Sequence, residues 1–363
     1  VEFYPTAIAI DQESSTMVIS GSSGAPPMTA QLHILQANAE GRFIDSSSVA
    51  SIDVPMAGDD DWIPNEVEMA RNYAIYSNKQ AICVISLRTQ RNYRAGQIVS
   101  VEEVLPYEEY AINNRVTGID YEPETGTLAV IWQHGNEAFS ILLYKLDRLT
   151  GTLHPITINP SGERQNEVAL PMGELIGLGS NVDFNKDATE FYIASSSSGT
   201  IYSYAIYANA GLVVKAVVEQ MADGKIQSAL RSPRKLIYRA VPGIGRINNG
   251  LFYISRPFGI SRPFGVKPSS VVLVDSYNGQ VAALQSFNDA VAVSMRVNAD
   301  GSRAYLGLQN GAVYGLDSKT GHLSLVTYQP EGLLSLTYEE STGLLAVTGM
   351  REASGVVNVV KVQ

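Results

Sequence analysis

The sequence predicts an all-β protein that folds as a single seven-bladed β-propeller of four-stranded antiparallel blades. Short runs rich in Val, Ile, Tyr and Leu recur along the 363 residues, and Gly, Asn, Asp and Ser bound them. Helical periodicity is hard to find. The runs also repeat as units of four strands, which is how a propeller blade is built.

Three units show the repeat most clearly, and they span residues 118–153, 181–212 and 294–323. Each consists of two strands joined by a polar turn and, after a gap, two more strands joined by an Asp- or Asn-containing turn that ends in Gly. In the last of the three, these turns are Asn298-Ala-Asp-Gly301 and Asp317-Ser-Lys-Thr-Gly321. Turns of this composition reverse the chain between antiparallel strands.

Applied to the whole chain, the repeat predicts seven units of about 52 residues. Their first strands are expected to begin near Thr6, Glu66, Thr117, Asn181, Ser228, Val293 and Leu334. The fifth unit is hard to align, so six or eight units stay open. No linker is visible, and one domain over residues 1–363 is expected. The two ends of the chain are expected to meet in one blade, with the strand Val356 to Val362 beside the first strand from Thr6, because ring closure removes sheet edges.

The segment Asn298-Ala-Asp-Gly-Ser-Arg-Ala-Tyr-Leu306, followed by Tyr314 to Leu323, resembles the repeat of the lactonase-like seven-bladed propellers. These include the 6-phosphogluconolactonase and carboxymuconate-cyclase group and the YVTN-type surface proteins. The resemblance implies the propeller fold. Members with lactonase activity carry Pro-Arg-His where a blade's innermost strand begins. Here the corresponding places read Gly179-Ser-Asn-Val182 and Asn114-Arg-Val-Thr117, so the catalytic motif is not matched.

Composition excludes several classes of protein. The 26 basic and 36 acidic residues give a net charge of −10, which disfavours binding to nucleic acid or to an anionic membrane. No run of about 18 apolar residues is present, so no membrane span is predicted. The single cysteine, Cys83, excludes an internal disulfide. The chain begins at Val1, and a removed leader is compatible with this. A periplasmic, secreted or cell-surface location is therefore favoured over a cytoplasmic one.

No motif for a catalytic nucleophile, a phosphate loop or a zinc-binding helix is present, so the sequence assigns no catalytic residue and no cofactor. The weak candidates for metal ligands are Asp59, Asp60 and Asp61, although such a run is usually a solvated loop. Asp183-Phe-Asn-Lys-Asp187 has calcium-loop spacing but lacks the Gly and Glu of such a loop, which favours an Asx-type turn.

Charge is unevenly distributed along the chain. Residues 225–267 hold nine basic residues and no acidic one, whereas the remainder has a net charge of −19. Within this basic segment the hexapeptide Ile-Ser-Arg-Pro-Phe-Gly occurs twice in succession, over 254–259 and 260–265. Arg beside an aromatic residue is common at recognition hot spots. The predicted binding residues are Arg256, Phe258, Arg262, Phe264, Lys267, Trp62 and Trp132.

A structural explanation stays open for each of these features. The basic segment could pair with acidic blades such as residues 1–70, which hold 11 acids and only Arg42 as a base, and the duplication could be a neutral insertion. Trp132-Gln-His134, just after a predicted second strand, could belong to a ligand cleft or could be a packed Trp with a hydrogen-bonded His.

Three functions follow from these observations. The first is a non-catalytic propeller that binds a partner protein or an anionic surface polymer through residues 225–267, as a domain of an exported or cell-surface protein. The second is a lactonase-like hydrolase with its site at the mouth of the central channel. The third is a cytoplasmic scaffold like the WD-repeat proteins, although the Gly-His and Trp-Asp repeat signatures are missing. The sequence favours the first and leans away from an enzyme.

Overall fold

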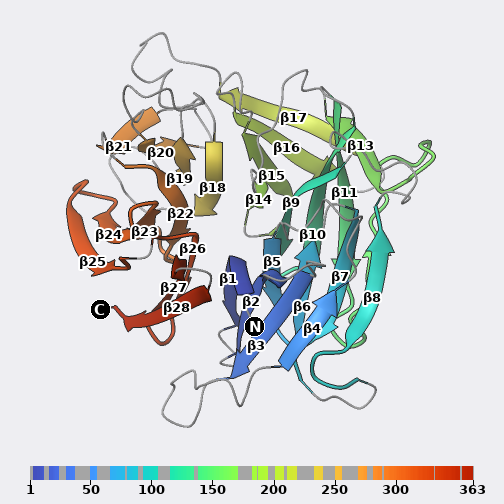
Figure 1. Ribbon diagram of the computed structural model, residues 1–363. Helices are drawn as coiled ribbons and strands as arrows, with labels where there is room; N and C mark the ends of the chain where they lie inside the picture. Colours follow the sequence, from blue (N-terminus) through green and yellow to red (C-terminus); the bar gives the residue numbers. More distant parts are fainter. Residues whose placement is uncertain are drawn as a thin grey trace.

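A computed structural model gives the fold in three dimensions (Figure 1). It describes residues 3–11, 16–23, 30–36, 50–54, 66–77, 80–88, 93–104, 115–134, 138–170, 182–185, 187–194, 201–207, 211–218, 233–239, 250–255, 269–275, 281–287, 290–330, 332–351 and 354–362. Over these residues the secondary structure is all strand, in 28 strands.

The 28 strands form seven antiparallel sheets, which we call blades 1 to 7 in chain order. Blade 1 is β1 (Phe3–Asp11), β2 (Thr16–Ser23), β3 (Ala30–Gln36) and β4 (Ala50–Val54). Blade 2 is β5 (Glu66–Ala70), β6 (Tyr73–Ser77), β7 (Ala81–Ser86) and β8 (Ile98–Glu103). Blade 3 is β9 (Arg115–Glu122), β10 (Thr127–His134), β11 (Ala138–Leu146), β12 (Leu153–Pro155) and β13 (Glu167–Leu170).

The other four blades follow in the same way. Blade 4 is β14 (Val182–Phe184), β15 (Glu190–Ala194), β16 (Ile201–Tyr207) and β17 (Gly211–Val218). Blade 5 is β18 (Pro233–Arg239), β19 (Gly250–Ser255), β20 (Ser269–Asp275) and β21 (Val281–Phe287). Blade 6 is β22 (Ala292–Val297), β23 (Arg303–Leu308), β24 (Ala312–Asp317) and β25 (Leu323–Tyr328), and blade 7 is β26 (Ser335–Glu339), β27 (Leu344–Arg351) and β28 (Ser354–Lys361).

The first strands of the blades form a closed ring. Each contacts the first strand of the blade on either side, in the order β1, β5, β9, β14, β18, β22, β26 and back to β1. Within each blade the strands then follow outward in chain order. This is the propeller that the sequence predicts, and the first strands begin close to the expected positions. The largest difference is in blade 5, which begins at Pro233 rather than near Ser228.

Apolar side chains fill the spaces between neighbouring blades. Strand β10 shows why, because its residues alternate between the two faces of the sheet. Leu128 and Val130 pack against blade 2, whereas Ala129 and Ile131 pack against blade 4. Similar buried clusters lie between blades 1 and 2, 5 and 6, 6 and 7, and 7 and 1. The core is therefore shared between blades, and each blade depends on its neighbours.

The predicted turns have the geometry that their residues favour. Gly151, Gly301 and Gly321 lie at φ of 73°, 68° and 71°, where a side chain would be strained. In the Asp183–Asp187 segment, the Asn185 side-chain oxygen accepts from the Glu190 N–H at 2.9 Å. Asp187 likewise accepts from the Thr189 hydroxyl at 2.6 Å. These bonds make the segment a hairpin turn of the Asx type.

Two blades depart from the four-stranded pattern. In blade 3 the place of the fourth strand is shared by β12 and β13, which both pair with β11. In blade 7 the described residues supply three strands.

The expectation that the two ends of the chain meet in one blade is wrong, although β28 does lie beside β1 as expected. β28 pairs with β27, and β1 pairs with β2. The blades at the two ends of the chain instead meet through side chains, because Val357 and Phe3 pack into the same apolar cluster.

Candidate functional site

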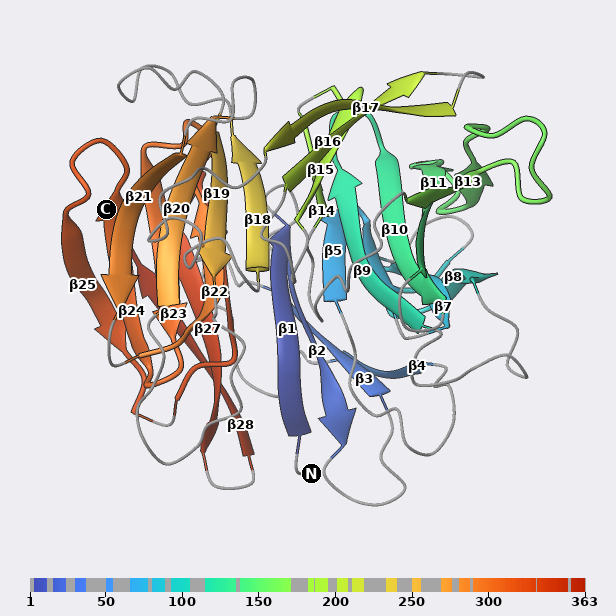
Figure 2. The same ribbon diagram turned by 90° about the horizontal axis from the view of Figure 1, so that it is seen from above.

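The order of the strands brings several of the predicted sites to one face of the propeller. Successive strands in a blade are antiparallel, so the second and fourth strands end on the face at which the first strand begins. We call this the N-face, since β1 begins there, and the N-terminus marks it in Figure 2. The strand ends that flank residues 55–65, 135–137 and 256–268 all lie on the N-face.

Most of the predicted binding residues fall outside the described residues. These are Trp62, Arg256, Phe258, Arg262, Phe264 and Lys267, and the metal candidates Asp59, Asp60 and Asp61 are outside as well. Trp132 is described, together with His134. Both residues lie within β10, at its C-terminal end. The expectation that they follow the second strand is therefore wrong, because this strand continues to His134.

The interrupted fourth strand of blade 3 brings further polar residues to Trp132. Between β12 and β13 the chain leaves the sheet for residues 156–166 and is held close to it. Ile158 is fully buried in the core between blades 3 and 4. The Leu143 N–H donates to the Asn166 carbonyl at 3.1 Å, and the Arg164 guanidinium donates to the Val104 carbonyl of blade 2 at 2.7 Å. Residues 156–166 are therefore held against blade 4 by Ile158 and against blade 2 by Arg164.

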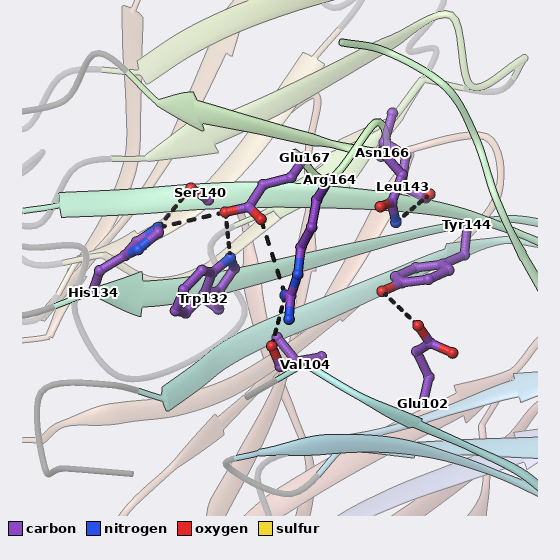
Figure 3. Close-up of polar contacts among 10 residues, drawn as sticks. All are labelled: Glu102, Val104, Trp132, His134, Ser140, Leu143, Tyr144, Arg164, Asn166 and Glu167. Atoms are coloured by element: carbon purple, nitrogen blue, oxygen red, sulfur yellow. Dashed lines mark hydrogen bonds and ion pairs between the residues drawn. The ribbon is translucent and has the colours of Figure 1, made fainter. Parts of the chain in front are cut away.

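Glu167, at the start of β13, is the centre of the cluster (Figure 3). Its Oε1 accepts a hydrogen bond of 3.1 Å from the Trp132 indole Nε1, and its Oε2 lies 4.0 Å from Arg164 Nη1. The Glu167 side chain is only 17% exposed. A half-buried carboxylate is stable when hydrogen bonds and an opposite charge replace its water, and both are present here.

His134 completes the cluster. Its ring stacks on the Trp132 indole with centroids 3.5 Å apart, tilted by 33°. His134 Nε2 lies 2.6 Å from the Ser140 hydroxyl oxygen and 3.8 Å from Glu167 Oε1. Burial lowers the pKa of His134 below its usual 6.5, the Arg164 charge lowers it further, and the Glu167 charge opposes both. The net shift therefore favours the neutral imidazole.

A serine, a histidine and a glutamate within bonding range raise the question of a catalytic triad. In a triad the serine and the acid occupy opposite ring nitrogens, so that the acid fixes the tautomer. Here Ser140 and Glu167 both approach Nε2 of His134. Ser140 is also 1% exposed, so its hydroxyl is closed off from a substrate. The arrangement suits a packed polar cluster with one accessible edge, formed by His134 and Arg164, rather than acyl transfer.

Other reactive groups do not add to this site. Burial raises the pKa of the Cys83 thiol to about 12, so the thiolate nucleophile is not available. Among the described residues, no three His, Cys, Asp or Glu side chains come together as a metal-ligand set. The described part of the chain also contains no helix long and apolar enough to cross a membrane.

Comparison with known proteins supports the fold. No protein-family profile matches the chain, and no curated protein matches it. Solved structures do match. A candidate 6-phosphogluconolactonase from Bacteroides fragilis NCTC 9343 aligns with a TM-score of 0.62 at 12% identity, over 92% of this chain and 86% of its own. The Cps50 (Swd1) β-propeller domain of Myceliophteria thermophila aligns with a TM-score of 0.58 at 12% identity, over 99% and 96%.

A second candidate 6-phosphogluconolactonase, from Bacteroides uniformis ATCC 8492, aligns with a TM-score of 0.55 at 11% identity, over 88% of this chain and 83% of its own. The chain has the fold of a β-propeller. The resemblance to the lactonase-like propellers is thus confirmed for the fold. At these identities the likeness extends to the fold alone.

Sequence reasoning found Trp132 and His134 but missed their partners Ser140, Arg164 and Glu167. Ser140 lies six residues from His134 across a hairpin, a spacing that strand pairing could have suggested. Glu167 reaches Trp132 because residues 156–166 leave the sheet and return to it, and the sequence of that segment resembles an ordinary turn. No pattern in the sequence indicates that the chain returns to the edge of β11 at Glu167.

Proposed function

We propose that this propeller is a non-catalytic binding domain that holds an acidic protein surface or an anionic surface polymer through the basic segment 225–267. One observation carries the proposal. The nine basic residues of this segment lie within or just before the part of the sequence that forms blade 5 (Pro233–Phe287), and the flanking sequence holds too few acidic residues to balance them.

The ring order provides the evidence. Strand β18 contacts β14 and β15 of blade 4 and β22 of blade 6. Residues 181–224, before the basic segment, hold two basic and five acidic residues, and residues 268–330, after it, hold three basic and four acidic ones, so the flanking sequence carries −4 against the +9 of the segment. Residues 1–70 supply blade 1 and the first strand of blade 2, which are not neighbours of blade 5. Pairing of the basic segment with that acidic region is therefore disfavoured.

A segment whose positive charge exceeds the negative charge of its flanking sequence attracts anionic partners locally, while the rest of a negative protein repels them. The strand ends that flank the duplicated Arg-Pro-Phe-Gly sequence lie on the N-face, as does the His134 and Arg164 edge of blade 3. A partner that reads the basic segment would approach the propeller from this face.

The test compares three proteins on immobilised poly-glutamate, which represents an acidic protein, and on an immobilised sulfated polysaccharide, which represents a polymer. These are the wild type, the triple variant Arg256→Glu, Arg262→Glu, Lys267→Glu, and a control in which Arg88, Arg94 and Lys319 become Glu. The control residues are exposed, lie outside the segment and change the net charge equally. The triple variant should bind at least about tenfold more weakly than the wild type, and the control less than about threefold more weakly.

The immobilised probe that retains the wild type distinguishes a protein partner from a polymer. Equal losses in the triple variant and the control would reduce the effect to net charge, and no retention of the wild type would contradict the proposal. Because charge attraction weakens over a Debye length of about 10 Å at 0.1 M salt, each comparison is run across a salt gradient.

A lactonase-like hydrolase is the second candidate, since two of the similar structures are described as candidate 6-phosphogluconolactonases. The geometry of the blade 3 cluster does not favour hydrolysis by Ser140, and the Pro-Arg-His motif is not matched in the sequence. Turnover of 6-phosphogluconolactone and of a simple lactone, measured with and without added divalent metal, tests this candidate. Turnover that survives Ser140→Ala would show that the active site does not use Ser140 and lies elsewhere in the molecule.

A further inference from the structure

Blade 7 differs from the other six at its outer edge. In blades 1 to 6 the third strand is covered by a fourth. The third strands β7 and β24 are accordingly mostly buried, and every residue of β7 is buried. In blade 7, no described strand pairs with the outer edge of the third strand, β28. None of Gly355 to Lys361 is buried, and Val359 is 40% exposed.

Along its outer edge, the backbone of β28 therefore has no partner strand among the described residues. The Val362 N–H donates to the Gly343 carbonyl at 2.7 Å, on the side of β27. Because alternate residues of an antiparallel strand bond to opposite sides, Val357, Val359 and Lys361 direct their N–H and C=O groups to the outer edge. Exposed edges usually carry Pro, several charges or a bulge that prevents pairing. Over Val356–Val360 this edge has none of these.

The sequence of β28 is complementary to itself. Around Asn358 it reads Val-Val-Asn-Val-Val. If two copies pair antiparallel with Asn358 opposite Asn358, each Val lies opposite a Val of the other copy. Pairs of β-branched side chains across strands are stabilising. The same register places Lys361 opposite Gly355, so the two lysines do not face each other. Val357 and Val359 then exchange backbone hydrogen bonds with the other copy.

We propose that two copies of this chain associate through β28, pairing antiparallel about Asn358 so that each supplies the fourth strand of the other's blade 7. A twofold axis through this pair closes the assembly as a dimer, because each β28 then has a strand paired on both of its sides. The N-face and the basic segment of blade 5 are not part of the contact, so the proposal is independent of the proposed function.

Sedimentation over a range of protein concentrations tests the association. The wild type should shift from the monomer mass to twice that mass. Val359→Pro removes an N–H that points away from β27, so the blade keeps its own ladder while the shared one is lost. Val359→Pro and Val359→Lys should each weaken association at least about tenfold. The matched control is Val101→Lys, since Val101 is 45% exposed on β8, the outer strand of a complete blade.

A cross-link tests the register. In the proposed pair the two Asn358 residues form a non-hydrogen-bonded pair with Cα atoms about 4.5 Å apart, which is within reach of a disulfide. Asn358→Cys should form a disulfide-linked dimer under mild oxidation, and Val101→Cys should not. The native Cys83 is buried and does not contribute. A wild type that stays monomeric at every concentration, or a dimer that persists in both Val359 variants, would overturn the proposal.

Discussion

Blades 3 and 7 are made by the same repeat, yet the surroundings of their third strands differ. In blade 3, β11 has β10 on one side and β12 with β13 on the other, and Ile141, Leu142 and Leu143 are all buried. In blade 7, β28 has a neighbour on one side, and none of its described side chains is buried. The repeat therefore determines the fold of a strand, whereas the neighbouring strands determine what it contributes to stability.

The largest expected difference between the two blades is in the cost of truncating a side chain. Ile141→Ala removes a fully buried side chain from the core between blades 3 and 4, and it should lower the free energy of unfolding by about 2–5 kcal/mol. Val359→Ala, on the corresponding strand of blade 7, should lower it by less than about 0.5 kcal/mol. Urea unfolding of the two variants measures both values.

That measurement is made on the monomer, at low protein concentration, so that association through β28 does not contribute. If the two substitutions cost the same free energy, then exposure of β28 does not reflect its contribution to stability. The inference that neighbouring strands determine what a strand contributes to stability would then fail.

A smaller effect is expected where blade 7 is attached to blade 6. The Ser294 hydroxyl on β22 accepts a hydrogen bond of 3.2 Å from the Leu336 N–H on β26. Ser294→Ala leaves this buried donor unpaired, which costs about 1–3 kcal/mol. In the Ser294→Ala variant, hydrogen exchange should be accelerated more in β26–β28 than in β9–β11. The reason is that blade 7 has fewer described strands than blade 3.

Ser161→Ala is the matched control, since the Ser161 hydroxyl is exposed and bonds weakly to Asn159 at 3.4 Å. It should leave the exchange pattern unchanged. Equal acceleration of exchange in blades 3 and 7 after Ser294→Ala would show that the ring opens as one unit.

The sequence predicted the repeat well because each blade carries local signals. Alternating apolar residues and turns such as Asn298–Gly301 determine the strands without help from distant residues. The starting points of most first strands follow from that regularity, whereas the poor alignment of the fifth unit left six or eight units open. The least regular unit, blade 5, was placed least well, and its first strand begins at Pro233.

The features that the sequence did not predict depend on distant contacts. The return of the chain to the sheet at Glu167 depends on the contacts of residues 156–166 with blades 2 and 4, through Arg164 and Ile158. Closure between blades 7 and 1 without a shared blade depends on side-chain packing between the two blades, such as that of Ala346 and Ile8. Neither leaves a periodic pattern, because each involves a single pair of surfaces that meets only in the folded chain.

The smallest expected difference is in pH dependence. Burial lowers the pKa of His134 in blade 3 below 6.5, while the described strands of blade 7 contain no histidine. Below pH 6.5 the unfolded chain binds a proton that the folded chain binds less readily, so stability is lost as pH falls from 6.5 toward the folded pKa. The slope attributable to one such group is at most about 1.4 kcal/mol per pH unit.

His134→Gln should therefore lose less stability than the wild type between pH 7.5 and pH 5.5, as measured by urea unfolding at the two values. His33 has a lowered pKa from burial as well, so His33→Gln should remove a separate part of the same loss. His322→Gln changes an exposed histidine and is the control. In hydrogen exchange, acid should accelerate opening of β10 and β13 in the wild type, and His134→Gln should reduce that acceleration. An acid loss that is unchanged in His134→Gln would mean that Glu167 compensates for burial, and the cluster would then contribute nothing to the difference between the two blades.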